Sequence, residues 1–197
     1  MSFRIEEKLH INNYKLTTFL NWVIENGGYK LHNSRVVSST YFDNRKNDMF
    51  HDSEEGSLPR KKIRVRSYSV AEHVVGSSML ETKISSIEGR YKTKISKFNL
   101  EKIMKIGIID SDYGVCKPIV RVTYDREYFS LFGVRVTIDR NIKYKSVDRP
   151  FIEVFDPGVA VEIKANYQTS AEYLIKKFPF YRTRLSKYSN AINLLNI

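Results

Sequence analysis

Eight segments of the chain alternate between apolar and polar side chains, one residue after the other. They lie at about residues 2–11, 35–43, 59–69, 78–86, 90–97, 119–129, 133–144 and 159–167. A period of two puts every second side chain on the same face, which is the pattern of a half-buried β-strand. Eight mostly antiparallel strands in one chain predict a closed, or nearly closed, β-barrel.

Four further segments have the spacing of amphipathic helices. They are residues 12–26, 98–106, 169–178 and 186–195, and the polar stretch 44–57 is expected to be a loop with a turn of helix. No Pro-, Gly- or Ser-rich linker divides the 197 residues. The expected fold is therefore α+β, a single domain over residues 1–197 dominated by an eight-stranded antiparallel closed β-barrel with helices packed outside.

The polar faces of the predicted strands are rich in charge. Arg60, Lys62, Arg64 and Arg66 share one face of the third strand, and a Glu-x-Lys pair recurs on the first, fourth and eighth strands. These faces either meet water, where ion pairs contribute little to stability, or line the inside of the barrel. Four like charges at alternate positions repel one another unless an anion neutralises them, which favours the second interpretation.

An interior rich in Arg and Lys with a few carboxylates suits one class of ligand. Phosphate oxygens accept hydrogen bonds from guanidinium and ammonium groups, and carboxylates hold a divalent metal that bridges the same oxygens. The chain has 33 Lys and Arg against 22 Asp and Glu, a net charge of +11, so an anionic partner is expected. Nucleic acid, a membrane surface and phosphate compounds all satisfy that balance.

Several other chemistries lack their residues in this sequence. Cys116 is the only cysteine, which excludes a disulfide framework and a thiolate metal cluster. The four histidines form no His-x-x-x-His pair for zinc, and there is no Gly-rich phosphate loop. No run approaches the roughly 20 apolar residues of a membrane helix, and the first residues have no apolar signal core. A cytoplasmic location is therefore expected.

A set of short motifs runs from one end of the chain to the other. They are Phe3-Arg-Ile-Glu-Glu-Lys8, Ser39-Thr-Tyr-Phe-Asp43, Arg60-Lys-Lys-Ile-Arg-Val-Arg-Ser-Tyr68, Leu80-Glu-Thr-Lys83, Val122-Thr-Tyr-Asp-Arg126, Arg135-Val-Thr-Ile-Asp139, Val161-Glu-Ile-Lys164 and Ser186-Lys-Tyr188. In this order they resemble the VTC polyphosphate polymerase domain, a branch of the CYTH-like triphosphate tunnel metalloenzymes. Each motif is weak alone, but the ordered set is specific and covers essentially the whole chain.

The resemblance implies a metal-dependent polyphosphate polymerase, which transfers the terminal phosphate of ATP to a growing chain inside a basic tunnel. It implies catalytic roles for Arg64 and Arg66, which clamp phosphates, and for Lys187, which closes one tunnel mouth. With the basic strand faces, the expected substrate ligands are Lys8, Arg60, Lys62, Lys83, Lys92, Lys94, Arg126, Arg135 and Lys164. Lys92 and Lys94 together cover one basic position of the family, and the sequence does not choose between them.

The metal ligands are expected among the carboxylates of the same faces. The resemblance implies that Glu162 is the principal ligand of Mn²⁺ or Mg²⁺. Glu162 also lies in an apolar run, where an unpaired carboxylate is costly, so it needs a metal or a cation as its partner. Glu6 is the second expected ligand, and Asp139 is expected to pair with Arg135 on its own strand. Arg4 stands where the phosphatase and cyclase branch has the first Glu of Glu-x-Glu-x-Lys, which favours the polymerase branch.

Other functions remain open at this point. The same fold supports an inorganic or nucleotide triphosphatase, a cyclase, and a non-catalytic sensor of polyphosphate or nucleotides. A nucleic-acid binder would use the +11 charge differently, with a steep salt dependence on long polymers. The expected partners are ATP and polyphosphate, with no nucleic acid. A separate membrane protein that receives the product is left open, and would place the chain at a membrane periphery.

Overall fold

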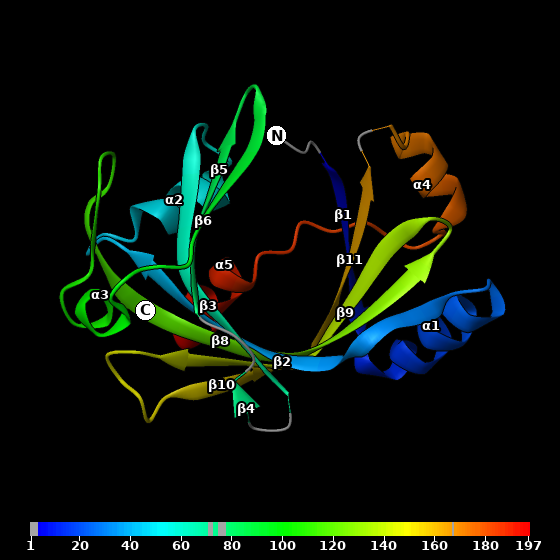
Figure 1. Cartoon of the computed structure of the whole chain (residues 1–197), viewed down its shortest axis with the longest axis horizontal. Helices are drawn as coiled ribbons and strands as arrows, with labels where there is room; N and C mark the ends of the chain where they lie inside the picture. The colour runs from blue at the N-terminus through cyan, green and yellow to red at the C-terminus, as the bar shows by residue number, and fades with distance from the viewer. Residues whose placement is uncertain (1–3, 71–72, 75–77, 167) are drawn as a thin grey trace. The chain divides into compact units, whose positions relative to one another are not determined.

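The computed structural model describes residues 4–70, 73–74, 78–166 and 168–197 (Figure 1). The first two residues of the predicted first strand, residues 2–3, lie outside the described residues, as does residue 167 at the end of the eighth. The side chain of Arg4, on which the choice between family branches depended, is also outside them.

Each of the eight predicted strands and four predicted helices is present in the described part of the chain, which confirms the α+β class. The predicted strands are β1 (Arg4–Asn12), β2 (Tyr29–Asp43), β3 (Arg60–Val70), β5 (Met79–Ser86), β6 (Gly89–Ile95), β8 (Gly114–Leu131), β9 (Val134–Ser146) and β11 (Gly158–Asn166). The predicted helices are α1 (Asn13–Glu25), α3 (Leu100–Ile106), α4 (Ala171–Lys177) and α5 (Lys187–Leu195).

Four elements were not predicted as such. The polar stretch 44–57 forms a helix of eight residues, α2 (Asp48–Glu55), in place of a loop with a single turn. Three short strands are added, namely β4 (His73–Val74), β7 (Ile108–Asp110) and β10 (Glu153–Asp156). β2 also begins six residues earlier than predicted, and the added residues 29–34 are all exposed.

The predicted closed barrel is wrong, because the sheet is open. Hydrogen-bonded strands follow in the order β1-β11-β9-β8-β2-β3-β5-β6, and β10, β4 and β7 pair with β9, β3 and β8. The two end strands, β1 and β6, are not paired with each other within the described ranges. Alternating side chains indicate strands but not whether the first and last of them meet, since closure depends on strand tilt and stagger.

Tertiary contacts divide the chain into two compact units. Unit 1 contains Met1–Val36, Tyr124–Ile142 and Phe155–Leu185, and unit 2 contains Val37–Thr123, Lys143–Val154 and Ser186–Ile197. The backbone passes from one unit to the other within strands β2, β8, β9 and β10. The assignment of residues 1–197 to one domain stays a prediction, and each unit is described by itself below.

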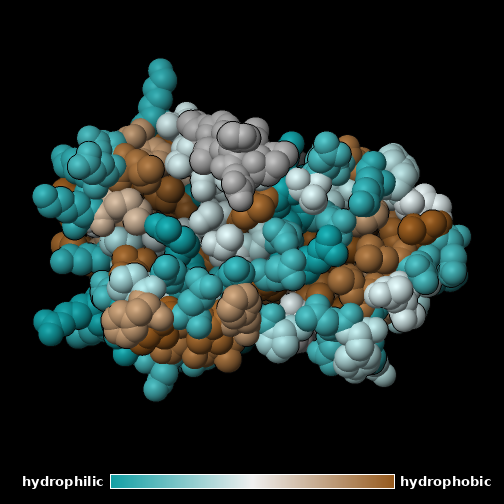
Figure 2. Space-filling model, turned by 90° about the horizontal axis from the view of Figure 1, so that it is seen from below, coloured by the Kyte–Doolittle hydropathy of each residue, from teal (hydrophilic) through white to brown (hydrophobic). Residues whose placement is uncertain are grey.

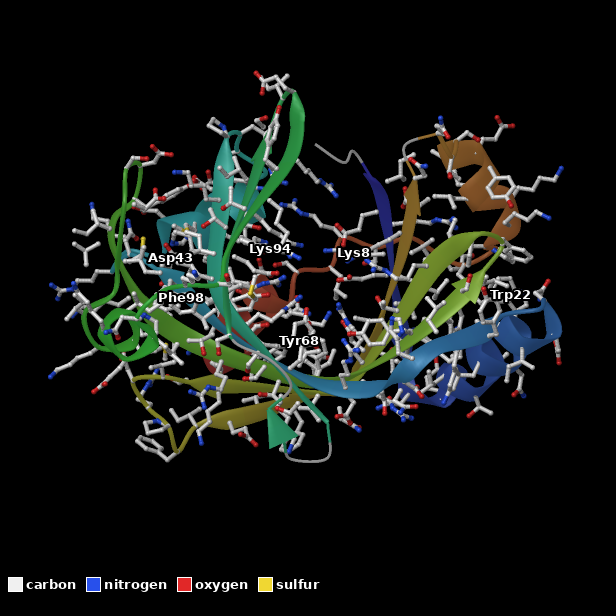
Figure 3. All side chains as sticks on the ribbon, in the orientation of Figure 1. Lys8, Trp22, Asp43, Tyr68, Lys94 and Phe98 are labelled. Carbon is white, nitrogen blue, oxygen red and sulfur yellow. The ribbon has the colours of Figure 1, made fainter. Side chains whose placement is uncertain are left out.

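The core of unit 1 lies between one face of its strands and two helices. Val161 and Ile163 of β11 are fully buried together with Phe19 of α1 and Leu174 of α4. Trp22 packs edge-on against Phe180, with ring centroids 4.9 Å apart (Figure 3). The apolar faces are therefore covered by helices, as the alternation predicts, and the charged side chains occupy the opposite face of each strand.

Unit 2 has its own core and a buried carboxylate that joins two of its helices. Phe42, Ile63 and Val65 pack in that core with Met49 of α2. Asp43, at the end of β2 (Figure 3), accepts hydrogen bonds from the backbone N–H of Phe50 at 2.9 Å and from the Tyr188 hydroxyl of α5 at 2.5 Å. Burial raises the pKa of Asp43 against these hydrogen bonds. Asp43 therefore connects the end of β2 to both α2 and α5.

No helix in the described part of the chain is long and apolar enough to cross a membrane. Hydrophobic side chains nevertheless reach the surface among the hydrophilic ones (Figure 2). Among the described residues, the large apolar side chains with the highest exposed fractions are Tyr181 at 98%, Ile87 at 89% and Ile109 at 85%.

Candidate functional site

Unit 2 holds a group of charged side chains, here called the arginine cluster: Arg64 and Arg66 of β3, Glu81 and Lys83 of β5, and Lys92 of β6. Arg64 Nε and Nη2 donate to Glu81 Oε2 at 2.8 and 2.6 Å. Arg66 Nη1 lies 4.0 Å from the same oxygen. Both arginines and Glu81 are less than one tenth exposed. The predicted phosphate clamp is thus assembled around one carboxylate.

Strand register explains why these residues meet. Arg64 lies directly opposite Glu81, and Lys62 opposite Lys83, in the antiparallel pair β3–β5. Cross-strand neighbours on one face have Cβ atoms about 5 Å apart. The cluster gathers four cationic side chains around the single carboxylate of Glu81, a composition that favours an anionic ligand.

Two side chains of β2 complete the arginine cluster. The Ser39 hydroxyl accepts a hydrogen bond from Arg66 Nε at 3.0 Å, and the Tyr41 hydroxyl accepts one from Arg64 Nη1, also at 3.0 Å. The Tyr41 ring stacks on Tyr188 of α5 with centroids 5.1 Å apart. Ser39 and Tyr41 belong to a motif that the sequence analysis quoted without assigning a role, and their period-two spacing with Asp43 is the signal that could have placed them on the charged face.

The structure distinguishes the two lysines that the sequence left undecided. Lys92 Nζ, on a side chain that is 34% exposed, forms an ion pair with Glu81 Oε1. Lys94 lies at the position opposite Glu81 (Figure 3) but forms no ion pair among the described residues. Burial lowers the pKa of Lys92 to about 8 despite its contact with Glu81. Lys92 therefore belongs to the arginine cluster, and it loses its charge just above neutral pH.

Glu81 gives unit 2 a stability that depends on pH. Burial raises the pKa of this carboxyl, but the charges of Arg64 and Arg66 outweigh burial and hold it at about 2 against a usual 4.5. Because the folded state binds this proton less tightly than the unfolded chain, its contribution is complete above about pH 4.5 and is lost as the pH falls towards 2. A shift of this size corresponds to about 3 kcal/mol.

We expect Glu81→Gln to lower the free energy of unfolding at pH 6 and to have progressively less effect as the pH approaches 2. Denaturant unfolding of both proteins at several pH values measures this difference. The exposed Glu153 of β10 supplies the control, since Glu153→Gln should leave the curve unchanged. An equal effect of Glu81→Gln at pH 6 and at pH 2.5 would contradict the assignment.

Three other predicted residues of unit 2 lie near the ends of their elements. Lys62 Nζ donates to the Ser186 hydroxyl at 2.8 Å, and Ser186 caps α5, of which Lys187 is the first residue. Arg60 Nη1 donates to the carbonyl oxygens of Gly56 and Ser57 at 3.2 and 3.0 Å. Arg60 thus holds the segment after α2, and its predicted role as a substrate ligand stays a prediction.

Unit 1 carries a second charged group on the face opposite its core, here called the β11 cluster: Glu6 and Lys8 of β1, Arg126 of β8, Arg135 and Asp139 of β9, and Glu162 and Lys164 of β11. Lys8 lies opposite Glu162 and Glu6 opposite Lys164 in the pair β1–β11, and Arg135 lies opposite Lys164 in the pair β11–β9. Residues far apart in sequence are thus brought to one face of one sheet.

The predicted pair between Asp139 and Arg135 is wrong, because Asp139 binds Arg126. Arg126 Nε and Nη2 donate to the two oxygens of Asp139 at 2.5 and 2.7 Å, and both residues are buried. A two-residue turn joins β8 to β9, and its residues Phe132 and Gly133 have φ of 51° and 72°, as a type I′ hairpin requires. The hairpin thus places Arg126 opposite Asp139 as a bidentate partner, which the spacing of residues along β9 alone could not predict.

Removal of Asp139 is expected to destabilise the protein strongly. Asp139→Asn leaves the buried guanidinium of Arg126 without its full counter-charge, which typically costs about 3–5 kcal/mol. Chemical denaturation with circular dichroism measures the loss. The exposed Asp148 is the matched control, and Asp148→Asn should change the free energy of unfolding little. A loss below about 1 kcal/mol would show that the pair contributes little to folding.

Glu6 and Glu162, the two predicted metal ligands, converge on one ammonium group. Lys164 Nζ lies 3.0 Å from Glu162 Oε2 and 3.3 Å from Glu6 Oε1. Arg126 Nη2 is 3.6 Å from Glu162 Oε2. The described residues contain no group of three or more His, Cys, Asp or Glu side chains that could hold a metal. Two carboxylates that already share a cation still fit Mg²⁺ or Mn²⁺, which commonly bind one or two carboxylates and take phosphate oxygens and water for the rest.

The remaining predicted cations of unit 1 lie on the same face. Lys8 Nζ donates to the carbonyl oxygen of Leu185 at 2.8 Å (Figure 3). Arg135 is half-buried, and its Nε atom is buried with no hydrogen-bond partner among the residues that the structure describes. A donor left in this way is costly to bury, so it is available to an anion that reaches this face.

The family is shown by comparison with known protein families. The model of the VTC domain matches residues 3–111 and 99–196, which together cover nearly the whole chain. The chain belongs to the VTC domain family. A comparison with curated protein sequences gave no match.

Solved structures with low sequence identity share the fold of this VTC domain. A protein of Pyrococcus horikoshii is 15% identical with a TM-score of 0.61, over 98% of this chain and 99% of that one. A protein of Vibrio parahaemolyticus, described as a candidate adenylate cyclase, is 18% identical with a TM-score of 0.60 and 98% coverage of each chain. A Hippeastrum protein named as an adenylyl cyclase, and described as having a dominant triphosphatase activity, is 15% identical with a TM-score of 0.53, over 97% and 96%.

Proposed function

We propose that this VTC domain is a polyphosphate polymerase, which binds ATP by its phosphates and transfers the terminal phosphoryl group to the end of a polyphosphate chain. The observation that carries the proposal is the arginine cluster, in which two buried guanidinium groups share a single carboxylate. Burying several cations around one anion is unfavourable unless a further anion enters, and a chain of phosphates supplies such charges at regular spacing.

The β11 cluster supports the same assignment from unit 1. Glu162, with Glu6, would hold the divalent metal, and Lys8, Arg126, Arg135 and Lys164 supply cations on the same face of the sheet. When bound, such a metal neutralises phosphate charge and polarises the phosphorus–oxygen bond. Lys164 then has a second role, because its ammonium group balances the two carboxylates when no metal is present.

Phosphoryl transfer requires no covalent catalysis by the protein. Phosphoryl transfer proceeds through a transition state whose charge lies on the phosphate oxygens, so positioned cations supply most of the catalysis. No side chain has to act as a nucleophile. Cys116 agrees with this, since it is buried and burial raises the pKa of its thiol to about 12, which makes a thiolate nucleophile unavailable.

A triphosphatase is the second candidate, favoured by the triphosphatase activity described for the Hippeastrum protein of the same fold. The same cations would bind the same triphosphate, and only the acceptor would differ, because water takes the place of a phosphate end. A non-catalytic sensor of polyphosphate would need the cations but not the carboxylates that hold a metal.

Incubation of the purified protein with ATP and Mn²⁺, followed by gel electrophoresis and phosphorus NMR, separates these functions. Long phosphate chains together with ADP are the expected products. Orthophosphate or pyrophosphate without chains would establish a hydrolase or a cyclase instead. Absence of turnover with retained binding of tripolyphosphate would leave a sensor. Binding of long nucleic acids that short triphosphate fails to displace would contradict all three.

A further inference from the structure

Tyr41 of β2 lies close to three cationic side chains, those of Arg64, Arg66 and Lys83. Its ring is less than one tenth exposed. The charged and titratable groups that face it come from every element around it: Arg64 and Arg66 of β3, Lys83 of β5, and Tyr188 of α5. Beyond these groups, Glu81 binds both Arg64 and Lys92. Asp43 accepts a hydrogen bond from Tyr188.

The direction of its hydrogen bond limits what the Tyr41 hydroxyl does. A guanidinium group can only donate, so the oxygen of Tyr41 accepts the 3.0 Å hydrogen bond from Arg64 Nη1. Across the described ranges of the chain, no acceptor is present for the proton of this hydroxyl. Tyr188, stacked on Tyr41, behaves differently because it donates its proton to Asp43 at 2.5 Å. The Tyr41 hydroxyl is therefore a donor that an oxygen of a ligand bound in the cluster can accept from.

We propose that the Tyr41 hydroxyl is a further phosphate ligand of the arginine cluster, which takes up a proton when a polyphosphate binds and donates it to a phosphate oxygen. The inference rests on the proposed function, because it needs the arginine cluster to bind phosphates. In the empty cluster the tyrosinate oxygen balances part of the charge of Arg64 and Arg66. A bound phosphate chain replaces that negative charge, and the hydroxyl is protonated again.

The electrostatics of the cluster agree with this geometry. Burial raises the pKa of Tyr41, but Arg64, Arg66 and Lys83 outweigh burial and lower it to about 7 from a usual 10. A bound polyanion removes the effect of these cations, so the pKa rises and binding takes up a proton above pH 7. Each pH unit above 7 then costs the wild type up to about tenfold in affinity.

Lys92 would also take up a proton near pH 8, so the contribution of Tyr41 has to be isolated. Tyr41→Phe keeps the stacked ring and removes the hydroxyl. Tyr181→Phe is the matched control, because Tyr181 is 98% exposed and also loses one hydroxyl. Lys92 is present in all three proteins and cancels in the comparison.

The first measurement is the ultraviolet absorbance of tyrosinate in the protein without ligand, titrated from pH 5 to pH 9. The wild type and Tyr181→Phe should show a step near pH 7 that corresponds to one tyrosine and is missing from Tyr41→Phe. Added tripolyphosphate should move this step to higher pH. If the three titrations coincide below pH 9, Tyr41 keeps its proton in the empty cluster and the inference is overturned.

The second measurement is calorimetric titration with tripolyphosphate at pH 8 in two buffers of different protonation enthalpy. The wild type and Tyr181→Phe should take up nearly one proton more than Tyr41→Phe. Tyr41→Phe should bind about fivefold more weakly than the wild type at pH 6, for the loss of one hydrogen bond. At pH 8 it should bind about twofold more tightly, because the wild type must first protonate Tyr41. Equal uptake in all three proteins overturns the inference and leaves the proposed function intact. A wild type that does not bind tripolyphosphate overturns the proposed function, and with it the phosphate contact of Tyr41.

Discussion

Arg66→Ala should weaken the binding of tripolyphosphate by about 100-fold while the protein stays folded. Hydrogen bonds between charged partners contribute about 1.5–3 kcal/mol each, and a clamping arginine offers more than one of them. The substitution leaves Glu81 bound by Arg64 and Lys92, so its main partners survive. Calorimetry with tripolyphosphate measures the affinity, and circular dichroism measures the folded fraction.

A matched variant separates the position of this charge from its mere loss. Arg45 is an exposed arginine of the same unit, and Arg45→Ala removes the same charge from outside the cluster. It should lower the affinity less than about threefold, because exposed charges are screened by salt. Equal losses for the two variants would show that net charge, and not the arginine cluster, attracts the anion.

Glu162→Gln should reduce metal-dependent turnover by at least about 100-fold. The amide keeps the size of the side chain but removes the negative charge that a divalent metal requires. It also leaves Lys164 with Glu6 as its remaining carboxylate partner in the β11 cluster. A titration of Mn²⁺ against the rate of ADP formation measures the effect, and turnover should not be restored at high Mn²⁺ concentration.

A measurement of Mn²⁺ binding distinguishes the loss of a metal ligand from a general loss of activity. Binding of Mn²⁺ in the presence of tripolyphosphate, followed by electron paramagnetic resonance, should weaken in Glu162→Gln and remain normal in the exposed control Glu153→Gln. If activity and Mn²⁺ binding both survive in Glu162→Gln, the metal is held elsewhere. If binding is lost but turnover persists, the metal is not required for the reaction.

The charged faces could be predicted from the sequence because alternation is a local property. Arg64 and Arg66 share a face with Lys62 since a strand repeats every two residues, and the structure places them together. Helix caps are equally local: Asn99, Ser170 and Ser186 accept hydrogen bonds from backbone N–H groups three residues further along the chain. The VTC family was also visible in the order of the motifs.

The partners of those charges could not be predicted in the same way. Asp139 was expected to bind Arg135, four residues back on its own strand, yet it binds Arg126 across a hairpin. Tyr41 and Ser39 were not assigned to the site, although they contact Arg64 and Arg66. Each of these contacts depends on which strands are neighbours and on the register between them. Neither the neighbours nor the register can be predicted from the residue spacing within one segment.

The local pattern of this VTC domain was therefore enough to predict its strands and the composition of their polar faces, and the order of its motifs resembled the family that the domain model shows. The open sheet, the choice of Lys92 over Lys94 and the capture of Asp139 by Arg126 depended on the three-dimensional arrangement. The physical reason is range. Side-chain alternation is fixed by the geometry of successive residues, whereas sheet closure and ion pairing are fixed by strands that lie far apart along the chain and meet only in the folded protein.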